Sequence, residues 1–358
     1  EKELLRPLLK GNEIRKYRID WGGLYVLYPH KTAKEKGRIE APVIPKNELR
    51  VKYPCTHNYL KKHKDDLKKR KYLMDSIKSG VRDEWYEIWN PRVPERFERM
   101  KIITPSMSNS NNFAFDREGK FYTTGPIYGI ILVSRLNQEV NYLFFLGVLN
   151  SKLQEFYFKH IATIKRGNFY EYRTQYLSHL PIKLPQTPEE QTFADEIINK
   201  VKQILEQVKH EQKSENFPED YLKEFRNMGE EFASLTISFN SNHKALEPVI
   251  TENIEDQGYN VVLGKKEPTL FVDSKPKADY VVATLEGKHA KKDEKLQLLV
   301  PKSDTIVEAM LKELKDDKAR ITSPSVAELE AEINELVYKL YGLNEADIKV
   351  IEDFLRRF

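Results

Sequence analysis

Cysteine is almost absent from this 358-residue chain, and its scarcity excludes one way of stabilising a fold. Cys55 is the single cysteine, so no disulfide can form within the chain. Such usage is typical of a reducing compartment, and we expect a cytoplasmic location. No apolar run approaches the roughly 20 residues that span a bilayer, so we expect no membrane contact. The charged first residues lack an initiator methionine and do not form a signal peptide, which indicates a fragment of a longer protein.

Motifs that would hold a cofactor or a metal are also missing. No glycine-rich loop has the spacing of a nucleotide-binding fingerprint. Adenine-specific DNA methyltransferases hold the flipped base with an Asn/Asp-Pro-Pro-aromatic loop, and this chain has no Pro-Pro pair. Asn90–Val93 supplies only half of that motif, and we interpret it as a turn. Cys55 and His57 lack a second pair of ligands at metal-binding spacing, and no Ser-His-Asp signature occurs. We therefore expect no catalytic residues, metal or cofactor within this chain.

The charge of the chain is divided unevenly along its length. Residues 1–185 contain 35 Lys and Arg against 20 Asp and Glu, a net charge of +15. Residues 186–358 contain 24 Lys and Arg against 35 Asp and Glu, a net charge of −11. Such asymmetry indicates that the first part meets a polyanion, although basic surfaces also occur in proteins that bind no nucleic acid.

The first 185 residues predict a mixed β/α domain, which we delimit as residues 1–185. Its predicted strands are short and separated by polar loops, and one helix is strongly apolar. The expected elements are a basic helix at 59–79, a strand at 101–105, a hairpin at 113–122, a strand at 128–133, the apolar helix at 141–159 and a closing strand at 179–185.

The apolar helix expected at 141–159 contains residues that do not suit a simple core helix. Gly147 costs about 1 kcal/mol relative to alanine, which predicts close contact with a neighbouring element. Asn150 and Ser151 need hydrogen-bond partners if they are buried. We interpret the segment as a core helix whose polar pair ties it to the strands that present the polar loops at 109–112 and 165–168.

Beyond residue 185 the pattern changes to longer helices. Thr187–Glu190 is a helix-start signature and predicts a long helix and linker at 186–229. Residues 230–320 predict a small α+β insertion of unknown role, and residues 321–358 predict a pair of helices. In the insertion we expect strands at 259–263, 269–272, 280–285 and 296–300 and a helix at 305–314. The expected fold class is therefore α+β.

Two other function classes stay open at this point. Asp279, Glu286 and Lys288 could mimic the acidic pair and lysine that hold magnesium in nucleases, provided that both carboxylates converge across a hairpin. Surface salt bridges are the alternative explanation for these residues. The acidic second part of the chain could also be a protein-interaction module that binds a partner subunit.

Several short motifs in residues 1–185 occur together in one order. They are Leu8–Tyr17, Tyr59–His63, Leu67–Arg70, Trp85–Ile88, Lys101–Pro105, Leu149–Leu153 and Leu180–Ile182. Together they resemble the TaqI-like C-terminal specificity domain, the target recognition domain of adenine-specific DNA methyltransferases and type IIG restriction-modification enzymes. Related modules occur in type I specificity subunits and in the methyltransferases of BREX phage-defence systems. The segment at 333–343 is also similar to the C-terminus of such enzymes, whereas 230–320 matches no family.

The resemblance implies a parent enzyme that transfers a methyl group from S-adenosylmethionine to the amino group of adenine, with or without a Mg²⁺-dependent nuclease. Its methyltransferase domain would lie upstream in the same chain or on a separate subunit. The present chain would then be non-catalytic and would supply double-stranded DNA specificity in phage defence. A type I specificity subunit is the alternative within the same resemblance.

Phosphate contacts position a protein on DNA, whereas contacts with base edges select the sequence. For base reading we expect two polar loops and two nearby cations: Asn109, Asn111, Asn112, Arg117, Lys120, Lys165, Arg166 and Asn168. For phosphate contacts we expect the basic helix: Lys61, Lys62, Lys64, Lys68, Lys69 and Arg70. A solvated turn or helix face is the alternative for each residue.

Overall fold

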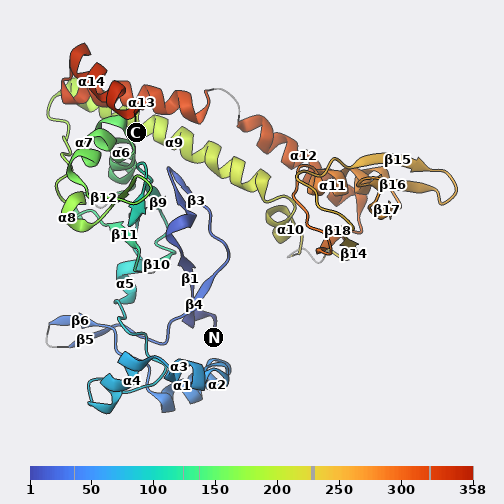
Figure 1. Cartoon of the computed structure of the whole chain (residues 1–358), viewed down its shortest axis with the longest axis horizontal. Helices are drawn as coiled ribbons and strands as arrows, with labels where there is room; N and C mark the ends of the chain where they lie inside the picture. The colour runs from blue at the N-terminus through green and yellow to red at the C-terminus, as the bar shows by residue number, and fades with distance from the viewer. Residues whose placement is uncertain (36, 124, 137, 227–229, 322–323, 358) are drawn as a thin grey trace. The chain divides into compact units, whose positions relative to one another are not determined.

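The computed structural model describes residues 1–357 except 36, 124, 137, 227–229 and 322–323 (Figure 1). The chain forms two compact units: unit 1 is Glu1–Leu205 with Val326–Phe358, and unit 2 is Glu206–Ser325. Helix α9 (Pro188–Glu215) passes from the first unit into the second. Helices and several small sheets are mixed in both units, so the predicted α+β class is confirmed.

Unit 1 begins with strands joined by tight turns. Strand β1 (Leu5–Leu9) pairs antiparallel with β4 (Tyr25–Leu27) and parallel with β10 (Tyr122–Thr123). Between them lies the hairpin of β2 (Ile14–Arg15) and β3 (Arg18–Ile19). The other short elements of this region are β5 (Ala33–Glu35), β6 (Arg38–Glu40), α5 (Pro94–Phe97) and the 3-10 turns Lys2–Leu4, Gly11–Glu13 and Ser134–Leu136.

The helical structure expected at 59–79 is confirmed, but it is not one continuous helix. The chain forms four short helices: α1 (Lys46–Lys52), α2 (Pro54–Lys62), α3 (Lys64–Lys68) and α4 (Lys71–Lys78). The break after α3 has a clear cause, because the Arg70 guanidinium donates to the carbonyl oxygens of Leu67, Trp85 and Glu87. These bends let Leu60 of α2 and Leu67 of α3 pack on one small core that also contains Leu49 and Tyr86.

The expected hairpin at 113–122 is also wrong, because its two arms join different sheets. Strand β9 (Ala114–Asp116) and strand β11 (Ile127–Ile130) pair on either side of β7 (Lys101–Pro105). The Asp116 carboxylate accepts the backbone N–H groups of Lys120 and Phe121, which turns the chain away from β9. The next strand, β10, then pairs with β1 instead.

The apolar helix expected at 141–159 is two helices, α6 (Glu139–Leu149) and α7 (Lys152–Ile161). Ser151 separates them, because its side chain accepts the N–H of Gln154 and so starts α7. A Cβ on Gly147 would lie 2.7 Å from Cγ2 of Ile197 and 2.9 Å from Cγ2 of Val201. The close contact predicted at this glycine is therefore confirmed, and its partner is α9.

Replacing Gly147 with alanine is expected to destabilise unit 1 by about 1–2 kcal/mol, because overpacking outweighs the helix-propensity gain of about 1 kcal/mol. Thermal unfolding followed by circular dichroism measures the effect. Gly125→Ala is the matched control, since no atom lies within 4 Å of a Cβ there. A variant at Gly147 as stable as the control would contradict the packing described.

The remaining helices of unit 1 support α6 and α7. They are α8 (Thr174–Leu177), the first part of α9, α13 (Val326–Tyr341) and α14 (Glu345–Leu355), and Figure 1 shows α13 and α14 beside α7. The helix start at Thr187–Glu190 is confirmed, because the Thr187 hydroxyl accepts the N–H of Glu190 and the Glu190 carboxylate accepts that of Thr187.

The strand expected at 179–185 is wrong. This proline-containing segment is held by the Tyr341 hydroxyl, which donates to the carbonyl oxygen of Pro181.

Unit 2 has its own apolar core, formed by α11 and α12 with two sheets. Its helices are α10 (Glu219–Arg226), α11 (Lys275–Leu285) and α12 (Asp304–Arg320). Its strands are β14 (Phe232–Ser238) paired antiparallel with β18 (Lys295–Pro301), and the antiparallel set β15 (Val249–Asn253), β16 (Gly258–Val262) and β17 (Thr269–Val272).

The strand expected at 280–285 is wrong, since these residues end helix α11. The Ser274 side chain accepts the N–H of Lys277, and a proline follows at the helix start. Ala278, Val281 and Leu285 are then buried at helical spacing. Among the helices in the described ranges, none is long and apolar enough to cross a bilayer.

Candidate functional site

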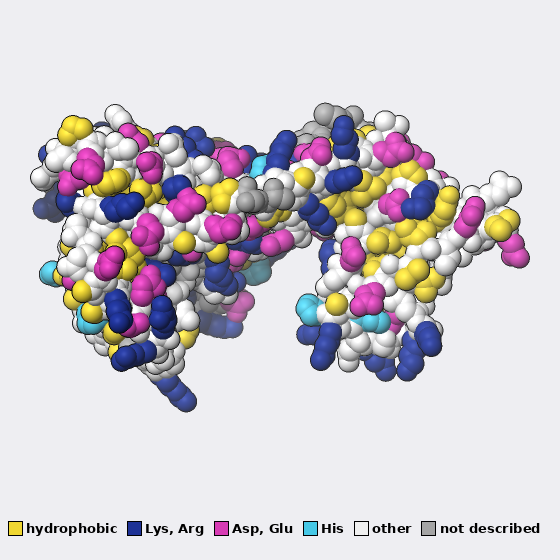
Figure 2. Space-filling model, turned by 90° about the horizontal axis from the view of Figure 1, so that it is seen from above, with side chains coloured by type: hydrophobic (Ala, Val, Ile, Leu, Met, Phe, Trp, Pro, Cys, Tyr) yellow, Lys and Arg dark blue, Asp and Glu magenta, His cyan; other side chains and the backbone are white. Residues whose placement is uncertain are grey.

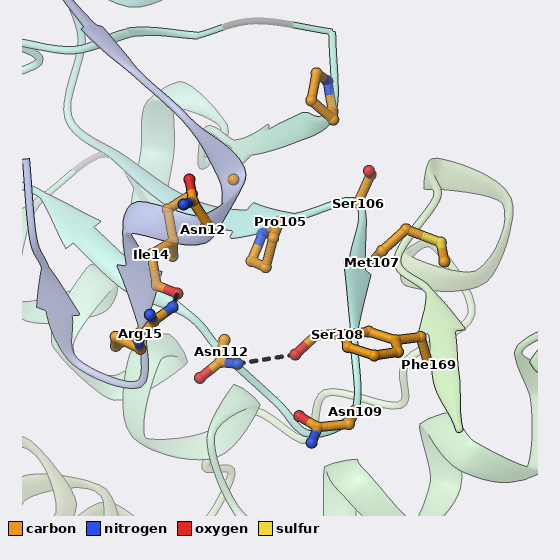
Figure 3. Close-up of a pocket in the computed structure, with 12 residues that line it drawn as sticks. Asn12, Ile14, Arg15, Pro105, Ser106, Met107, Ser108, Asn109, Asn112 and Phe169 are labelled. Atoms are coloured by element: carbon orange, nitrogen blue, oxygen red, sulfur yellow. Dashed lines mark hydrogen bonds between the residues drawn. The ribbon is translucent and has the colours of Figure 1, made fainter. Parts of the chain in front are cut away.

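A pocket of about 430 Å³ opens on unit 1 where three separate segments meet (Figure 3). The first is the turn before the β2–β3 hairpin, the second runs from the end of β7 through β8 (Met107–Ser108), and the third is strand β13 (Phe169–Glu171). The residues that line the pocket are Gly11, Asn12, Ile14, Arg15, Pro105, Ser106, Met107, Ser108, Asn109, Asn112, Pro126 and Phe169.

A small sheet brings the two predicted reading loops together. Strand β13 pairs with β8 on one side and with β12 (Ile164–Lys165) on the other. The loop at 109–112 follows β8 directly, while the turn at 166–168 joins β12 to β13. Gly167 and Asn168 have φ angles of 80° and 60°, so this tight turn uses two left-handed residues. Residues 163–169 are exposed, and the turn therefore projects into solvent.

The three asparagines of the first loop have different roles. Asn109 is exposed and lines the pocket. Asn112 also lines it and donates to the Ser108 hydroxyl at 2.8 Å (Figure 3). Asn111 is only 2% exposed; it donates to the Leu149 carbonyl at 2.7 Å and accepts from the Tyr172 hydroxyl at 2.8 Å. Because its donor and acceptor are both used internally, we remove Asn111 from the base-reading set.

The cations of the predicted reading set are also placed differently. Arg166 is exposed and makes no ion pair in the part of the chain that the structure describes. Lys165 lies 3.3 Å from the Glu171 carboxylate, which partly neutralises it. Arg117 pairs with Glu139 at 2.9 Å, and neither Arg117 nor Lys120 lines the pocket.

Lys120 lies instead over an aromatic pair at the side of the unit. Its ammonium is 5.5 Å from the ring centre of Trp21 and 5.6 Å from that of Phe121. A cation–π contact of this kind stabilises an exposed lysine by about 0.5–1 kcal/mol. Lys120 therefore has a structural contact that the sequence pattern did not indicate.

Sequence reasoning missed four residues that the pocket contains. Asn12 and Arg15 are exposed and lie in the motif at 8–17, which was used only to identify the family. Met107 and Phe169 are 40% and 41% exposed although they are apolar. In the sequence, a Phe directly after a Gly-Asn pair is the available signal. A turn there places the ring near the surface, where it offers a stacking face.

A buried hydrogen-bond cluster holds the pocket segments in place. Asn150 accepts the N–H of Phe113 at 3.1 Å and donates to its carbonyl at 2.9 Å. That carbonyl also accepts the N–H of Tyr17, at 2.9 Å, in the turn of the β2–β3 hairpin. Burial raises the pKa of the Tyr17 phenol well above its usual range, and the Glu330 carboxylate adds to this. Two family-like motifs, at 8–17 and 149–153, thus meet at the backbone of Phe113.

The predicted phosphate set lies on α2 and α3 and does not line the pocket. Lys61, Lys62 and Lys68 are exposed and make no ion pair with any described residue. Lys64 lies 5.7 Å from the ring centre of Trp85, and Lys69 pairs with Asp66 at 2.7 Å. As described above, the Arg70 guanidinium is bound to three carbonyl groups, so we remove Arg70 from this set.

The arrangement required for a magnesium nuclease is not formed. The expected hairpin is absent, since Asp279 lies in α11 and pairs with Lys275, four residues earlier in the same helix. No group of three or more His, Cys, Asp or Glu that could hold a metal occurs among the described residues. The surface salt bridge is therefore the explanation that holds for Asp279.

Amides in the loop at 109–112, an arginine without an ion pair to a described residue in the turn at 166–168 and an aromatic face on β13 indicate that unit 1 is a recognition module. The family model of the TaqI-like C-terminal specificity domain matches residues 6–182, and this part of the chain belongs to that family.

One relative extends the match beyond the family model. The type II methyltransferase M.BanIII of Aneurinibacillus aneurinilyticus is 28% identical to this chain over 209 residues. The matched part is 57% of this chain and 33% of the relative, so the chain corresponds to about a third of that methyltransferase.

Proposed function

We propose that unit 1 reads a specific sequence of double-stranded DNA on behalf of a DNA methyltransferase. The observation that carries this proposal is the pairing of β8 with β13, which brings the loop at 109–112 to the pocket and places the turn at 166–168 next to Phe169, a residue that lines it. Membership of a specificity-domain family supports it. So does the similarity to a type II methyltransferase.

The chemistry of the pocket suits the edges of base pairs. The amides of Asn109 and Asn112 match the donor–acceptor pair of adenine in the major groove, and the Arg166 guanidinium in the neighbouring turn, a donor, matches the two acceptors of guanine. Phe169 and Met107 offer apolar contact to a thymine methyl group. Lys61, Lys62 and Lys68 would bind phosphates and set the register on the duplex without reading sequence.

For the parent protein we propose an adenine-specific methyltransferase that acts in the cytoplasm as part of a restriction-modification system in phage defence. S-adenosylmethionine would supply the methyl group. The residues of this chain do not fit that cofactor, since no glycine-rich nucleotide loop is present, so another domain or subunit would bind it. A map of methylated bases in the host genome, with and without the gene, tests this proposal and gives the recognised sequence.

Arg166→Ala is expected to relax sequence preference. The loss of one bidentate contact to guanine removes about 1–3 kcal/mol of discrimination, or roughly 5- to 150-fold between cognate and single-mismatch duplexes. Cognate duplexes are first selected from a randomised pool with the unchanged chain, and both affinities are then measured by fluorescence anisotropy.

The matched control for Arg166 is Arg357→Ala, which removes an exposed arginine outside the pocket. We expect Arg357→Ala to leave the discrimination ratio unchanged. Equal losses by Arg166→Ala on cognate and mismatched duplexes would show that Arg166 contacts only the backbone.

A further inference from the structure

Three loops of unit 2 are joined by hydrogen bonds and form one surface. They run from 239 to 246, from 264 to 267 and from 287 to 295. His243 and Ala290 form a β-bridge between the first and third loops, and Lys292 donates its N–H to the Asn242 side chain at 2.8 Å. Asn240 donates to the Lys266 carbonyl at 2.7 Å and so joins the first loop to the second.

The Glu267 carboxylate fixes these loops from inside. Its side chain is fully buried, and it accepts from the backbone N–H of Asn240 at 2.8 Å, from the hydroxyl of Ser241, and from Nε2 of His243 at 2.8 Å. Burial alone would raise the pKa of Glu267, but these hydrogen bonds, together with the charge of His243, lower it to about 2. This negative charge is therefore directed into the loops and away from the surface.

The outer side of the three loops is covered with lysines, which we call the lysine patch. Its members are Lys244, Lys265, Lys266, Lys288, Lys291, Lys292 and Lys295. All are exposed except Lys288, which is half-buried, and none of them makes an ion pair in the described part of the chain. Figure 2 shows Lys, Arg and His side chains gathered at one end of unit 2.

The lysine patch is positively charged, although the unit that carries it has a net negative charge. Residues 206–325 contain 18 Lys and Arg against 23 Asp and Glu. Elsewhere in unit 2, lysines such as Lys223, Lys275 and Lys302 pair with nearby carboxylates. Within the patch Glu294 accepts the backbone N–H of Lys291 at 2.8 Å and makes no ion pair with a described lysine. The exposed acidic residues of the same loops, Asp293 and Glu294, balance only part of this charge. The remaining cations repel one another, and a polyanion removes that repulsion.

We propose that the lysine patch binds the phosphate backbone of duplex DNA outside the base pairs that unit 1 reads. This inference rests on the function proposed above, because a chain that already binds DNA brings unit 2 to a duplex. Lysine ammonium groups act as point charges, and phosphate contacts carry no sequence information. The loops contain no Tyr or Trp, and their one Phe, Phe239, is buried, so only the imidazole of His289 is exposed for stacking by unpaired bases.

The test compares two triple variants of the full chain that lose the same charge. The patch variant is Lys266→Ala, Lys291→Ala and Lys292→Ala. The control variant is Lys312→Ala, Lys315→Ala and Lys318→Ala, which removes exposed lysines of α12 that make no ion pair with a described residue. The affinity of each for a random-sequence 40-base-pair duplex, for cognate and mismatched duplexes and for a single-stranded RNA is measured across salt concentrations. Thermal unfolding checks that both variants are folded.

We expect the patch variant to bind about tenfold more weakly near physiological salt, with a salt slope shallower by about 2–3, since each lost phosphate contact changes it by about 0.9. The control variant should bind nearly as the unchanged chain does. Equal losses in both variants, or no loss in the patch variant, would overturn the proposal. A loss confined to single-stranded RNA, with duplex binding intact, would assign another polyanion and would overturn it as well.

The same measurements separate this proposal from the function of unit 1. If the lysine patch binds only backbone, the patch variant keeps the full ratio between cognate and mismatched duplexes. If unit 1 has no sequence preference, the unchanged chain shows no such ratio, yet the difference in salt slope between the two triple variants still stands. The ratio between cognate and mismatched affinities therefore tests the proposed function of unit 1. The difference in salt slope between the two triple variants tests the lysine patch.

Discussion

Asp116→Asn is expected to destabilise unit 1 by about 3–5 kcal/mol, because it leaves the ammonium of Lys101 buried without a counter-charge. Both side chains are 3% exposed or less, and they face each other across the β7–β9 register. Asparagine preserves the size of the side chain but keeps only one of the two oxygens that separately accept the N–H groups of Lys120 and Phe121. The loss therefore combines the unpaired charge with one lost acceptor, and chemical denaturation followed by circular dichroism measures it.

The pH dependence of this variant has a definite sign. Burial lowers the pKa of Lys101 below its usual 10.5, and the Asp116 carboxylate opposes that shift. Without the carboxylate, the pKa of Lys101 in the folded state falls further. The unfolded state then binds more protons than the folded state between the two pKa values, so the stability of Asp116→Asn rises with pH across that window. The unchanged chain should show a weaker rise.

Two further variants isolate the buried pair. Lys101→Met combined with Asp116→Asn removes both charges, and we expect it to recover much of the lost stability, since no buried charge is left. Asp66→Asn breaks the exposed pair with Lys69 and should cost less than about 1 kcal/mol. A double variant as unstable as Asp116→Asn alone would show that the loss does not come from the unpaired lysine.

Asn150→Ala is expected to cost about 2–4 kcal/mol and also to lower sequence discrimination. It leaves the buried N–H of Phe113 without a partner, which costs about 1–3 kcal/mol, and removes one of the two bonds to the Phe113 carbonyl, which keeps the N–H of Tyr17. Phe113 follows the loop at 109–112, so an unfixed backbone there also loosens Asn109 and Asn112 in the pocket. Denaturation measures the first effect, and the cognate-to-mismatch affinity ratio measures the second.

The direction of each hydrogen bond can be tested separately. Asn150→Asp keeps an acceptor for the N–H of Phe113 but places a second carboxylate oxygen against its carbonyl, so its loss should approach that of alanine. Asn141→Ala is the control on the same helix; it removes one bond, to Leu136, and should cost about 1 kcal/mol. If Asn150→Asp were as stable as the unchanged chain, the donor role of Asn150 would be wrong.

The sequence predicted the two loops of the site but could not predict how they meet. Asparagine runs and a Gly-Asn pair are local signals of polar turns, and they can be recognised in the amino-acid sequence alone. Strands β8 and β12 are two residues long, too short for any alternation of burial to appear. The pairing of β8 with β13 depends on contacts between segments more than fifty residues apart, which no local pattern encodes.

Residues of one type also differ in ways that only packing decides. Asn109, Asn111 and Asn112 are equivalent in the sequence, yet Asn111 faces the core because the Tyr172 hydroxyl and the Leu149 carbonyl lie on that side. The lysine patch was hidden for a related reason. Its members come from three loops, and the acidic composition of residues 186–358 concealed a local excess of positive charge.

The division of unit 1 into two stretches of chain sets an order of events during synthesis. Unit 2 is made of consecutive residues, so its core can close as soon as α12 leaves the ribosome. Unit 1 must wait for α13 and α14, since Asn334 accepts the N–H of Lys152 at 2.8 Å and Glu352 pairs with the Lys152 ammonium at 2.7 Å. Until then, the parts of α6 and α7 that contact α13 and α14 have no cover. A nonsense mutation after residue 325 would therefore yield a chain whose insertion folds while its reading surface does not.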